Sequence, residues 1–332
     1  MQAFAFTRAS DIQQAVQAGA HASTAQQGAE VRFVAGGTTL IDLMKLDVEQ
    51  PNQVVDINHL PLNQVETTAD GRLKIGALVR NADLAVLPEV QRNYTVLSQA
   101  LLAGASGQLR NMATTGGNLL QRTRCVYFRD VNSACNKREP GSGCPAIEGY
   151  NRNLAILGVS PHCIATHPSD MNVALTTLDA AIVIQGTKGE RTVPIEEFFL
   201  LPGDTPQRET VMEPGDLITY VLLPKPQQGA RSHYLKLRDR ASYEFALASA
   251  AVAVTMHEGK IATARVAMGG IATRPWRSHE AERVLIGQSP APALFDQAAQ
   301  ALLADARPQP GNAFKQELAR RCLVEALAQV TA

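Results

Sequence analysis

Four of the chain's five cysteines gather within 39 residues, and thiolates are strong ligands for zinc and for iron–sulfur clusters. They are spaced C-x9-C-x8-C-x18-C, at Cys125, Cys135, Cys144 and Cys163. No C-x-x-C pair is present, and structural zinc sites usually draw on such close pairs. The four thiolates of a [4Fe-4S] cluster, in contrast, can come from widely spaced loop positions. The spacing therefore predicts a metal centre and leaves both metals open.

The surroundings of these cysteines bear on which centre they hold. Cys144 is followed by Pro145, a step that often closes the ligand runs of ferredoxins. Nearby basic residues outnumber acidic ones and would offset the negative charge of a cluster; they are Arg122, Arg124, Arg129, Lys137 and Arg138. Residue chemistry alone supports an iron–sulfur cluster and a zinc ion about equally. Disulfides rank third, because a neutral chain of this size without a signal peptide is a poor candidate for them.

Two glycine pairs, each beside threonines, form a second candidate site. The first is Ala35-Gly36-Gly37-Thr38-Thr39-Leu40, and the second is Ala113-Thr114-Thr115-Gly116-Gly117-Asn118. Neither matches the dinucleotide fingerprint G-x-G-x-x-G or the phosphate loop G-x-x-x-x-G-K-[ST]. Both offer closely spaced backbone N–H groups, and the first opens a predicted helix, which suits a pyrophosphate. For either pair alone, tight turns that need positive φ are the better-supported interpretation.

The composition excludes several classes of partner and activity. Lys and Arg number 31, as do Asp and Glu, so the chain has no basic field for gripping nucleic acid. No apolar stretch approaches the length of a membrane span, and the first residues lack the pattern of a signal peptide. Neither a G-x-S-x-G elbow nor an H-E-x-x-H motif is present. We therefore expect no catalytic residue in this chain.

The periodicity of apolar residues predicts the elements that position these groups. Ser10-Asp11-Ile12-Gln13 is typical of a capping box that opens a short helix. Strands are predicted at 31–35, 54–57, 73–77, 180–184, 217–223, 248–256 and 261–268, and helices at 40–45, within 81–103, and at 278–286, 293–304 and 312–330. The fifth cysteine, Cys322, has helical spacing in the last helix, which predicts a buried thiol rather than a ligand.

Two irregular segments interrupt this pattern. From Leu119 to about Pro161 the periodicity fades into Arg, Asn, Gly and Pro, over a length that is unusual for a connection within a compact domain. Such a loop usually has a function or is held by a staple. The run Pro224-Lys225-Pro226-Gln227-Gln228-Gly229 breaks both ladders and helices, so it predicts the main domain boundary.

In their order along the chain, these pieces resemble the FAD-binding subunits of the xanthine dehydrogenase and carbon monoxide dehydrogenase family. RFVAGGTTLIDLMK at 32–45 and GQLRNMATTGGNLL at 107–120 are similar to the family's two pyrophosphate motifs. HPSDMNVAL at 167–175 is similar to its Ser-Asp segment. The remaining matches are GDLITYVLLP at 215–224, YLKLRDRASYEFALASAAVAV at 234–254 and VAMGGIATRPWR at 266–277. The resemblance covers nearly the whole chain.

The resemblance implies an α+β fold with two domains. Residues 1–226 would form a two-part FAD-binding domain of the PCMH/vanillyl-alcohol-oxidase type, with subdomains at 1–60 and 61–226. Residues 229–332 would form a smaller α+β C-terminal domain like that of the CO dehydrogenase flavoprotein.

Position by position, the resemblance also implies which residues hold FAD. The pyrophosphate and ribityl region is assigned to Arg32, Phe33, Val34, Ala35, Gly36, Gly37, Thr38, Thr39, Leu40, Thr114, Thr115, Gly116, Gly117 and Asn118. Asp170 is expected on ribityl or ribose hydroxyls. Ile218 and Lys236 are expected against the cofactor, with Lys236 near the negative charge of the reduced ring.

One departure from the family pattern is informative. Asn118 and Asp170 are about fifty residues apart, whereas most of the family separates these motifs by a handful of residues. The four clustered cysteines lie in this extra segment, at about 119–166. It resembles the insertion of bacterial periplasmic aldehyde oxidoreductases, whose flavin subunit carries a [4Fe-4S] cluster. The resemblance therefore favours iron–sulfur over zinc and implies that all four cysteines are metal ligands.

The function that the resemblance implies is electron transfer within a molybdenum-dependent aldehyde oxidoreductase. Aldehyde oxidation would occur at a molybdenum cofactor in a large partner subunit, and electrons would arrive through a small partner with two [2Fe-2S] centres. FAD would pass them to an external acceptor such as ferredoxin, a quinone or oxygen. A periplasmic location, reached through a partner's signal, is implied by the resemblance alone, and the cytoplasm is the alternative.

Two other functions stay open at the level of sequence. A stand-alone FAD-dependent oxidase or reductase of the same superfamily predicts turnover by the isolated chain. A zinc-stapled scaffold, in which the glycine pairs are mere turns, predicts a colourless protein.

Overall fold

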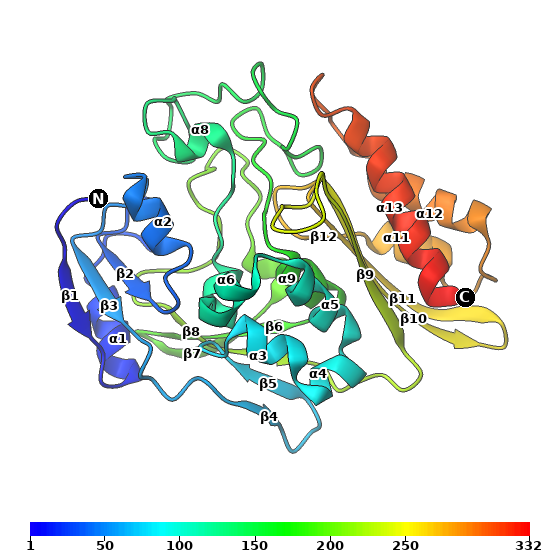
Figure 1. Ribbon diagram of the computed structural model, residues 1–332, viewed down its shortest axis with the longest axis horizontal. Coiled ribbons are helices and arrows are strands. Elements are labelled where there is room, and N and C mark those ends of the chain that lie inside the picture. The colour runs from blue at the N-terminus through cyan, green and yellow to red at the C-terminus, as the bar shows by residue number, and fades with distance from the viewer.

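The computed structural model describes residues 1–332, whose strands form three sheets (Figure 1). The first sheet is parallel, with the spatial order β1 (Ala5–Arg8), β3 (Gln53–Asp56) and β2 (Val31–Val34). Parallel strands need crossover connections, and here two helices serve in them, α1 (Ile12–Gly19) and α2 (Leu40–Lys45). The first glycine pair lies between β2 and α2, as the change in periodicity predicts.

Helix α1 begins one residue later than the predicted capping box. Asp11, not Ser10, is the N-cap, and its carboxylate accepts a hydrogen bond from the Gln14 N–H at 2.8 Å. The Gln14 side chain in turn accepts from the Ser10 N–H at 2.6 Å. A charged acceptor binds a helix N–H at least as well as a hydroxyl does, which explains the shift.

The second sheet is antiparallel and occupies the middle of the molecule (Figure 1). Its spatial order is β4 (Val65–Thr67), β5 (Leu73–Gly76), β8 (Leu217–Leu223), β6 (Ala181–Gly186) and β7 (Gly189–Pro194). The helices of this part are α3 (Asn81–Val86), α4 (Pro88–Asn93), α5 (Thr95–Ala103), α6 (Gly107–Met112), α7 (Thr115–Leu119), α9 (Asp170–Thr177) and α10 (Ile195–Phe198). Ile75, Ile182 and Val221 of the sheet share one core with Leu97 and Ala174 of the helices.

The third sheet is also antiparallel and is covered on both faces. Its spatial order is β12 (Trp276–Arg277), β11 (Lys260–Gly269), β10 (Ala248–His257) and β9 (Arg231–Leu237). Helices α11 (His279–Leu285), α12 (Pro292–Leu303) and α13 (Phe314–Thr331) pack on one face, and α5 and α9 on the other. Alternate residues of β10 therefore enter different cores. Cys322 is buried in α13, so the prediction of a buried helix thiol is confirmed.

The segment between α7 and α9 contains a single short helix, α8 (Val126–Arg129), at the top of the view in Figure 1. It is anchored to both neighbouring parts of the molecule. On one side Arg129 pairs with Asp42 of α2 at 2.9 Å. On the other side the Ile156 N–H donates to the Ile271 carbonyl at 2.8 Å, beyond the end of β11. The segment thus bridges the first and third sheets.

The α+β fold predicted from the sequence is confirmed, and so are all the predicted strands and helices. The sequence does not predict β1, β4, β7, β9 or β12. Strands β1 and β7 are largely exposed edge strands, so they lack the apolar alternation that marks a half-buried strand.

None of the helices combines the length and the apolar character that crossing a membrane requires.

Candidate functional site

The first glycine pair allows two loops to touch. A Cβ on Gly36 would lie 1.9 Å from the carbonyl oxygen of Met112, so any side chain there would force the loops apart. Gly37 has φ +72°, a conformation that favours glycine. The absence of a side chain at Gly36 lets the loop after β2 lie against the chain that leads into the second glycine pair.

The second glycine pair lies in a helix, not in a tight turn. Thr114 is the N-cap of α7, and its hydroxyl accepts a hydrogen bond from the Gly117 N–H at 3.2 Å. Gly116 packs closely against Ala77, because a Cβ on it would meet the Ala77 Cβ at 3.0 Å. Gly117 is exposed, whereas Gly116 is buried.

These backbones border a cavity of about 260 Å³, which we call the glycine-lined cavity. Twelve of the residues assigned to FAD line it: Arg32, Phe33, Ala35, Gly36, Gly37, Thr38, Thr39, Leu40, Thr114, Gly116, Gly117 and Ile218. Val34, Thr115 and Asn118 lie behind the lining. The Thr115 hydroxyl donates to the Val79 carbonyl at 3.1 Å, and the Asn118 side chain accepts from the Ser169 hydroxyl at 2.8 Å. Their role here is to fix the second glycine loop.

Asp170 and Lys236 are not brought to this cavity. They form a buried ion pair with each other at 2.8 Å, and the Lys236 ammonium also donates to the Ala103 carbonyl at 3.0 Å. The hydroxyl of Tyr234 donates to the same carboxylate. Burial, followed by the charge of Asp170, raises the pKa of Tyr234 well above its ordinary value. Asp170 lines a neighbouring cavity instead, together with His167 and Cys125.

One wall of the glycine-lined cavity, the loop between α10 and β8, is not predicted from the sequence. Glu209, Thr210, Met212 and Asp216 of this loop line the cavity. Gln26 holds the loop in place, because its side-chain amide donates to the Met212 carbonyl at 2.7 Å and accepts from the Glu209 N–H at 3.0 Å. The repeated Pro-Gly-Asp at 202–204 and 214–216 was a turn signal that could have drawn attention to it.

The four predicted metal ligands are brought together. All are free thiols, and they line one small cavity, which we call the cysteine cavity. Burial raises the pKa of Cys125 to about 12 and also raises the pKa values of Cys144 and Cys163, so a metal would have to displace protons. No group of three or more His, Cys, Asp or Glu side chains is arranged to hold a single metal ion as it stands.

Backbone N–H groups point at the sulfur atoms. The Ala165 N–H donates to Cys163 Sγ at 3.5 Å. Backbone N–H groups of Tyr127 and Phe128 oppose the rise in the pKa of Cys125, and those of Ile164, Ala146 and Ile147 do so for Cys144. Donors of this kind favour thiolates and are a known influence on iron–sulfur clusters.

The two cavities share a wall. Cys163, Lys137 and Ala165 line both of them. A group bound among the cysteines and a cofactor bound beside the glycines would therefore be close neighbours.

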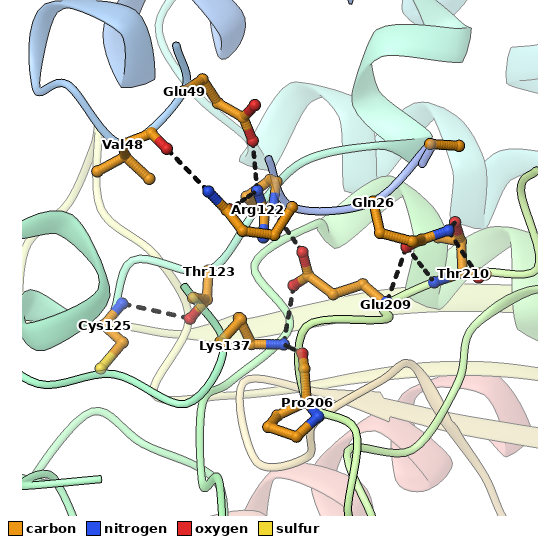
Figure 2. A network of polar contacts seen from close by, with 12 residues as sticks. Gln26, Val48, Glu49, Arg122, Thr123, Cys125, Lys137, Pro206, Glu209 and Thr210 are labelled. Atoms are coloured by element: carbon orange, nitrogen blue, oxygen red, sulfur yellow. Dashed lines mark hydrogen bonds and ion pairs between the residues drawn. The ribbon is translucent and has the colours of Figure 1, made fainter. Parts of the chain in front are cut away.

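Five charged side chains line the glycine-lined cavity and form what we call the ion chain, of which Figure 2 labels Glu49, Arg122, Glu209 and Lys137. Glu49 pairs with Arg32 at 2.8 Å and with Arg122 at 2.5 Å. Glu209 pairs with Arg122 and, at 3.0 Å, with Lys137. Burial raises the pKa of Glu209, but the charges of Arg122 and Lys137 outweigh burial and lower the pKa to about 2.

Both parts of the chain match known protein families. Residues 2–226 match the FAD binding domain in molybdopterin dehydrogenase. Residues 233–330 match the CO dehydrogenase flavoprotein C-terminal domain.

Individual proteins agree with these matches. The chain is 50% identical to the aldehyde oxidoreductase FAD-binding subunit PaoB of Escherichia coli strain K12, over 100% of this chain and 99% of that protein. It is 29% identical to the glyceraldehyde dehydrogenase medium chain of Sulfolobus acidocaldarius, over 86% of this chain and 82% of that protein. A solved structure of carbon monoxide dehydrogenase from Hydrogenophaga pseudoflava has the same fold, with a TM-score of 0.77 and 23% identity over 99% of this chain and 97% of that chain.

Proposed function

The chain belongs to the FAD-binding subunits of the molybdenum hydroxylase family, and from that premise we propose that it transfers electrons within an aldehyde oxidoreductase. The observation that carries the proposal is the 50% identity, over the whole chain, to a FAD-binding subunit whose name specifies aldehyde. Bound FAD supplies the junction between one-electron donors and one- or two-electron acceptors. The chain itself binds and orients the cofactors.

The glycine-lined cavity fits FAD because both glycine pairs line it. The exposed Gly117 has no side chain to hinder the approach of a pyrophosphate. Arg32 and Arg122 supply positive charge at the same wall. Ile218 offers an apolar surface for a ring.

Substitution of Gly117 tests this assignment. A Cβ on Gly117 meets only the Thr114 hydroxyl, at 3.0 Å, so Gly117→Val fills the cavity and leaves the packing behind it in place. We expect the purified variant to lose most of its FAD, measured by flavin absorbance per chain. Gly107→Ala is the matched control, since a Cβ there meets nothing within 4 Å. Wild-type FAD content in Gly117→Val would contradict the assignment.

We further propose a [4Fe-4S] cluster held by Cys125, Cys135, Cys144 and Cys163. The support is chemical: four free thiols line one cavity, backbone N–H groups point at the sulfurs, and Lys137 lines the same cavity. Four thiolates around a multi-iron cluster stand farther apart than around a single ion. Cys163 lines both cavities, so the cluster can exchange electrons with the flavin directly.

Metal analysis and an absorbance spectrum of the purified protein test the cluster. The expected result is flavin bands with a broad absorption near 400 nm and about four irons per chain. Zinc in place of iron would contradict the cluster and favour a structural staple.

The proposal includes partners and a location. A large molybdenum-cofactor subunit would oxidise the aldehyde, and a small subunit with two [2Fe-2S] centres would deliver the electrons. The isolated chain should then show no aldehyde oxidation, whereas the complex should show it; turnover by the isolated chain would favour a stand-alone flavoenzyme. Export on a partner's signal would place the complex in the periplasm, which release of activity by osmotic shock tests.

A further inference from the structure

The charges of the ion chain do not cancel. Its members alternate in sign from Arg32 through Glu49, Arg122 and Glu209 to Lys137, so three cations face two anions. All five side chains line the glycine-lined cavity, and Lys137 also lines the cysteine cavity. The ion chain therefore carries one excess positive charge beside the glycine-lined cavity.

The Lys137 end of the ion chain lies beside the cysteine cavity. Lys137 has one carboxylate partner, Glu209, and shares it with Arg122, whose guanidinium lies on the other side. The ammonium's other contact is the Pro206 carbonyl at 2.9 Å, a neutral acceptor. Lys137 is only 8% exposed, so water screens its charge little.

We propose that Lys137, held by the ion chain, is a positioning residue that raises the reduction potential of the cysteine-bound cluster relative to the flavin beside it. The inference rests on the proposed [4Fe-4S] cluster. Such a cluster gains one negative charge when it takes one electron, and the flavin that gives the electron loses it. A fixed cation next to Cys163 stabilises the reduced cluster and so favours this direction of transfer.

A structural role makes a different prediction. The Lys137–Glu209 contact also ties the cysteine segment to the loop between α10 and β8. If tying were its whole purpose, removal of either partner would loosen the cavity and move the potential in the same direction. If charge is the purpose, removal of the cation and removal of the anion move the potential in opposite directions.

The test is a redox titration of the cluster in the assembled complex, followed by EPR, with iron and FAD measured in the same samples. Lys137→Met should reduce the ratio of reduced to oxidised cluster at a fixed potential about tenfold, which is a midpoint about 59 mV more negative. Glu209→Gln should shift the midpoint to more positive values. Lys137→Arg keeps the charge and should stay near the wild type. Lys315→Met is the matched control, because Lys315 is also buried but binds the Gly270 carbonyl at 2.7 Å, outside both cavities, and its loss should leave the midpoint unchanged.

The outcomes separate this inference from the proposed function. Opposite shifts in Lys137→Met and Glu209→Gln support it, and shifts of one sign, or none, overturn it. If Lys137→Met loses its iron, Glu209→Gln decides, since an unchanged or more negative midpoint contradicts the inference. Iron missing from the wild-type complex would instead contradict the cluster itself, and the inference would fall with it.

Discussion

The glycine-lined cavity and the cysteine cavity meet at Cys163, yet different kinds of structure hold them. The first is bordered by elements of two sheets, and its shape depends on positions such as Gly36 where no side chain fits. The second lies in a segment with one four-residue helix, held by side-chain contacts and a few backbone bonds to its neighbours. Ladders distribute stability over many bonds, whereas side-chain contacts are few and matter singly. The first cavity should therefore lose its cofactor when a side chain is added, and the second should lose its metal when one group is removed.

Loss of one cysteine should have the largest effect, and this effect should be confined to one of the two regions. Cys135→Ser removes one of four thiolates, so we expect iron to be lost while much of the FAD is retained, because Cys135 does not line the glycine-lined cavity. Iron and flavin contents of the same sample provide the measurement. Cys322→Ser, at the buried thiol of α13, is the control and should leave iron unchanged. Full retention of iron in Cys135→Ser would show that it is not a ligand.

Arg122 forms ion pairs with Glu49 and Glu209 beside the glycine-lined cavity, and its loss should lower the stability of the fold. Arg122→Met leaves the carboxylates of Glu49 and Glu209 without their shared partner, and breaking a buried ion pair in this way costs about 3–5 kcal/mol. Chemical denaturation of the cofactor-free chain measures the loss. Arg320→Met is a matched control, because Arg320 also has two acidic partners but lies at the surface, where we expect little change. Equal effects of the two substitutions would contradict the central role of Arg122.

His167 lies where the glycine-lined cavity adjoins the cavity of Asp170, and it should make stability depend on pH. Burial lowers its pKa from 6.5 to about 4, so between these values the unfolded chain binds a proton that the folded chain does not. Stability is therefore fully present above pH 6.5 and falls as the pH drops toward 4, by about 3 kcal/mol in all. His167→Gln removes this titration, so its urea midpoint should fall less than that of the wild type between pH 7 and pH 5. Parallel curves would mean that His167 is not held neutral.

The sequence predicted the glycine-lined cavity more completely than the wall beside it, and the reason is distance along the chain. The first glycine pair shows itself locally, because apolar spacing changes from that of a strand to that of a helix around it. In the ion chain, Arg122 finds Glu49 and Glu209 at separations of 73 and 87 residues. No local pattern marks such pairs, so the basic residues near the cysteines were interpreted only as a diffuse positive charge.

Two site predictions illustrate the same limit. Asp170 and Lys236 were each assigned to the cofactor by position, and the structure pairs them with each other across 66 residues. Taken alone, the second glycine pair favours a tight turn, but the hydroxyl of Thr114 caps it into a helix. In both cases the type of residue was informative, and its partner was visible only in three dimensions.

The end of the cysteine segment offers the finest comparison, because two of its side-chain contacts with the C-terminal part of the chain differ in kind, one charged and one neutral. Arg152 pairs with Asp239 at 2.7 Å, but their side chains are 39% and 50% exposed, so Arg152→Ala should cost less than about 1 kcal/mol. The buried amide of Asn312 donates to the Leu154 and Ala155 carbonyls at 3.3 Å each, so Asn312→Ala should cost about 1–3 kcal/mol. Denaturation midpoints of both variants test the order. If the ion pair proves the stronger contact, charge rather than burial decides how this segment is held. The buried ion chain would then not be expected to stabilise the fold more than exposed ion pairs do.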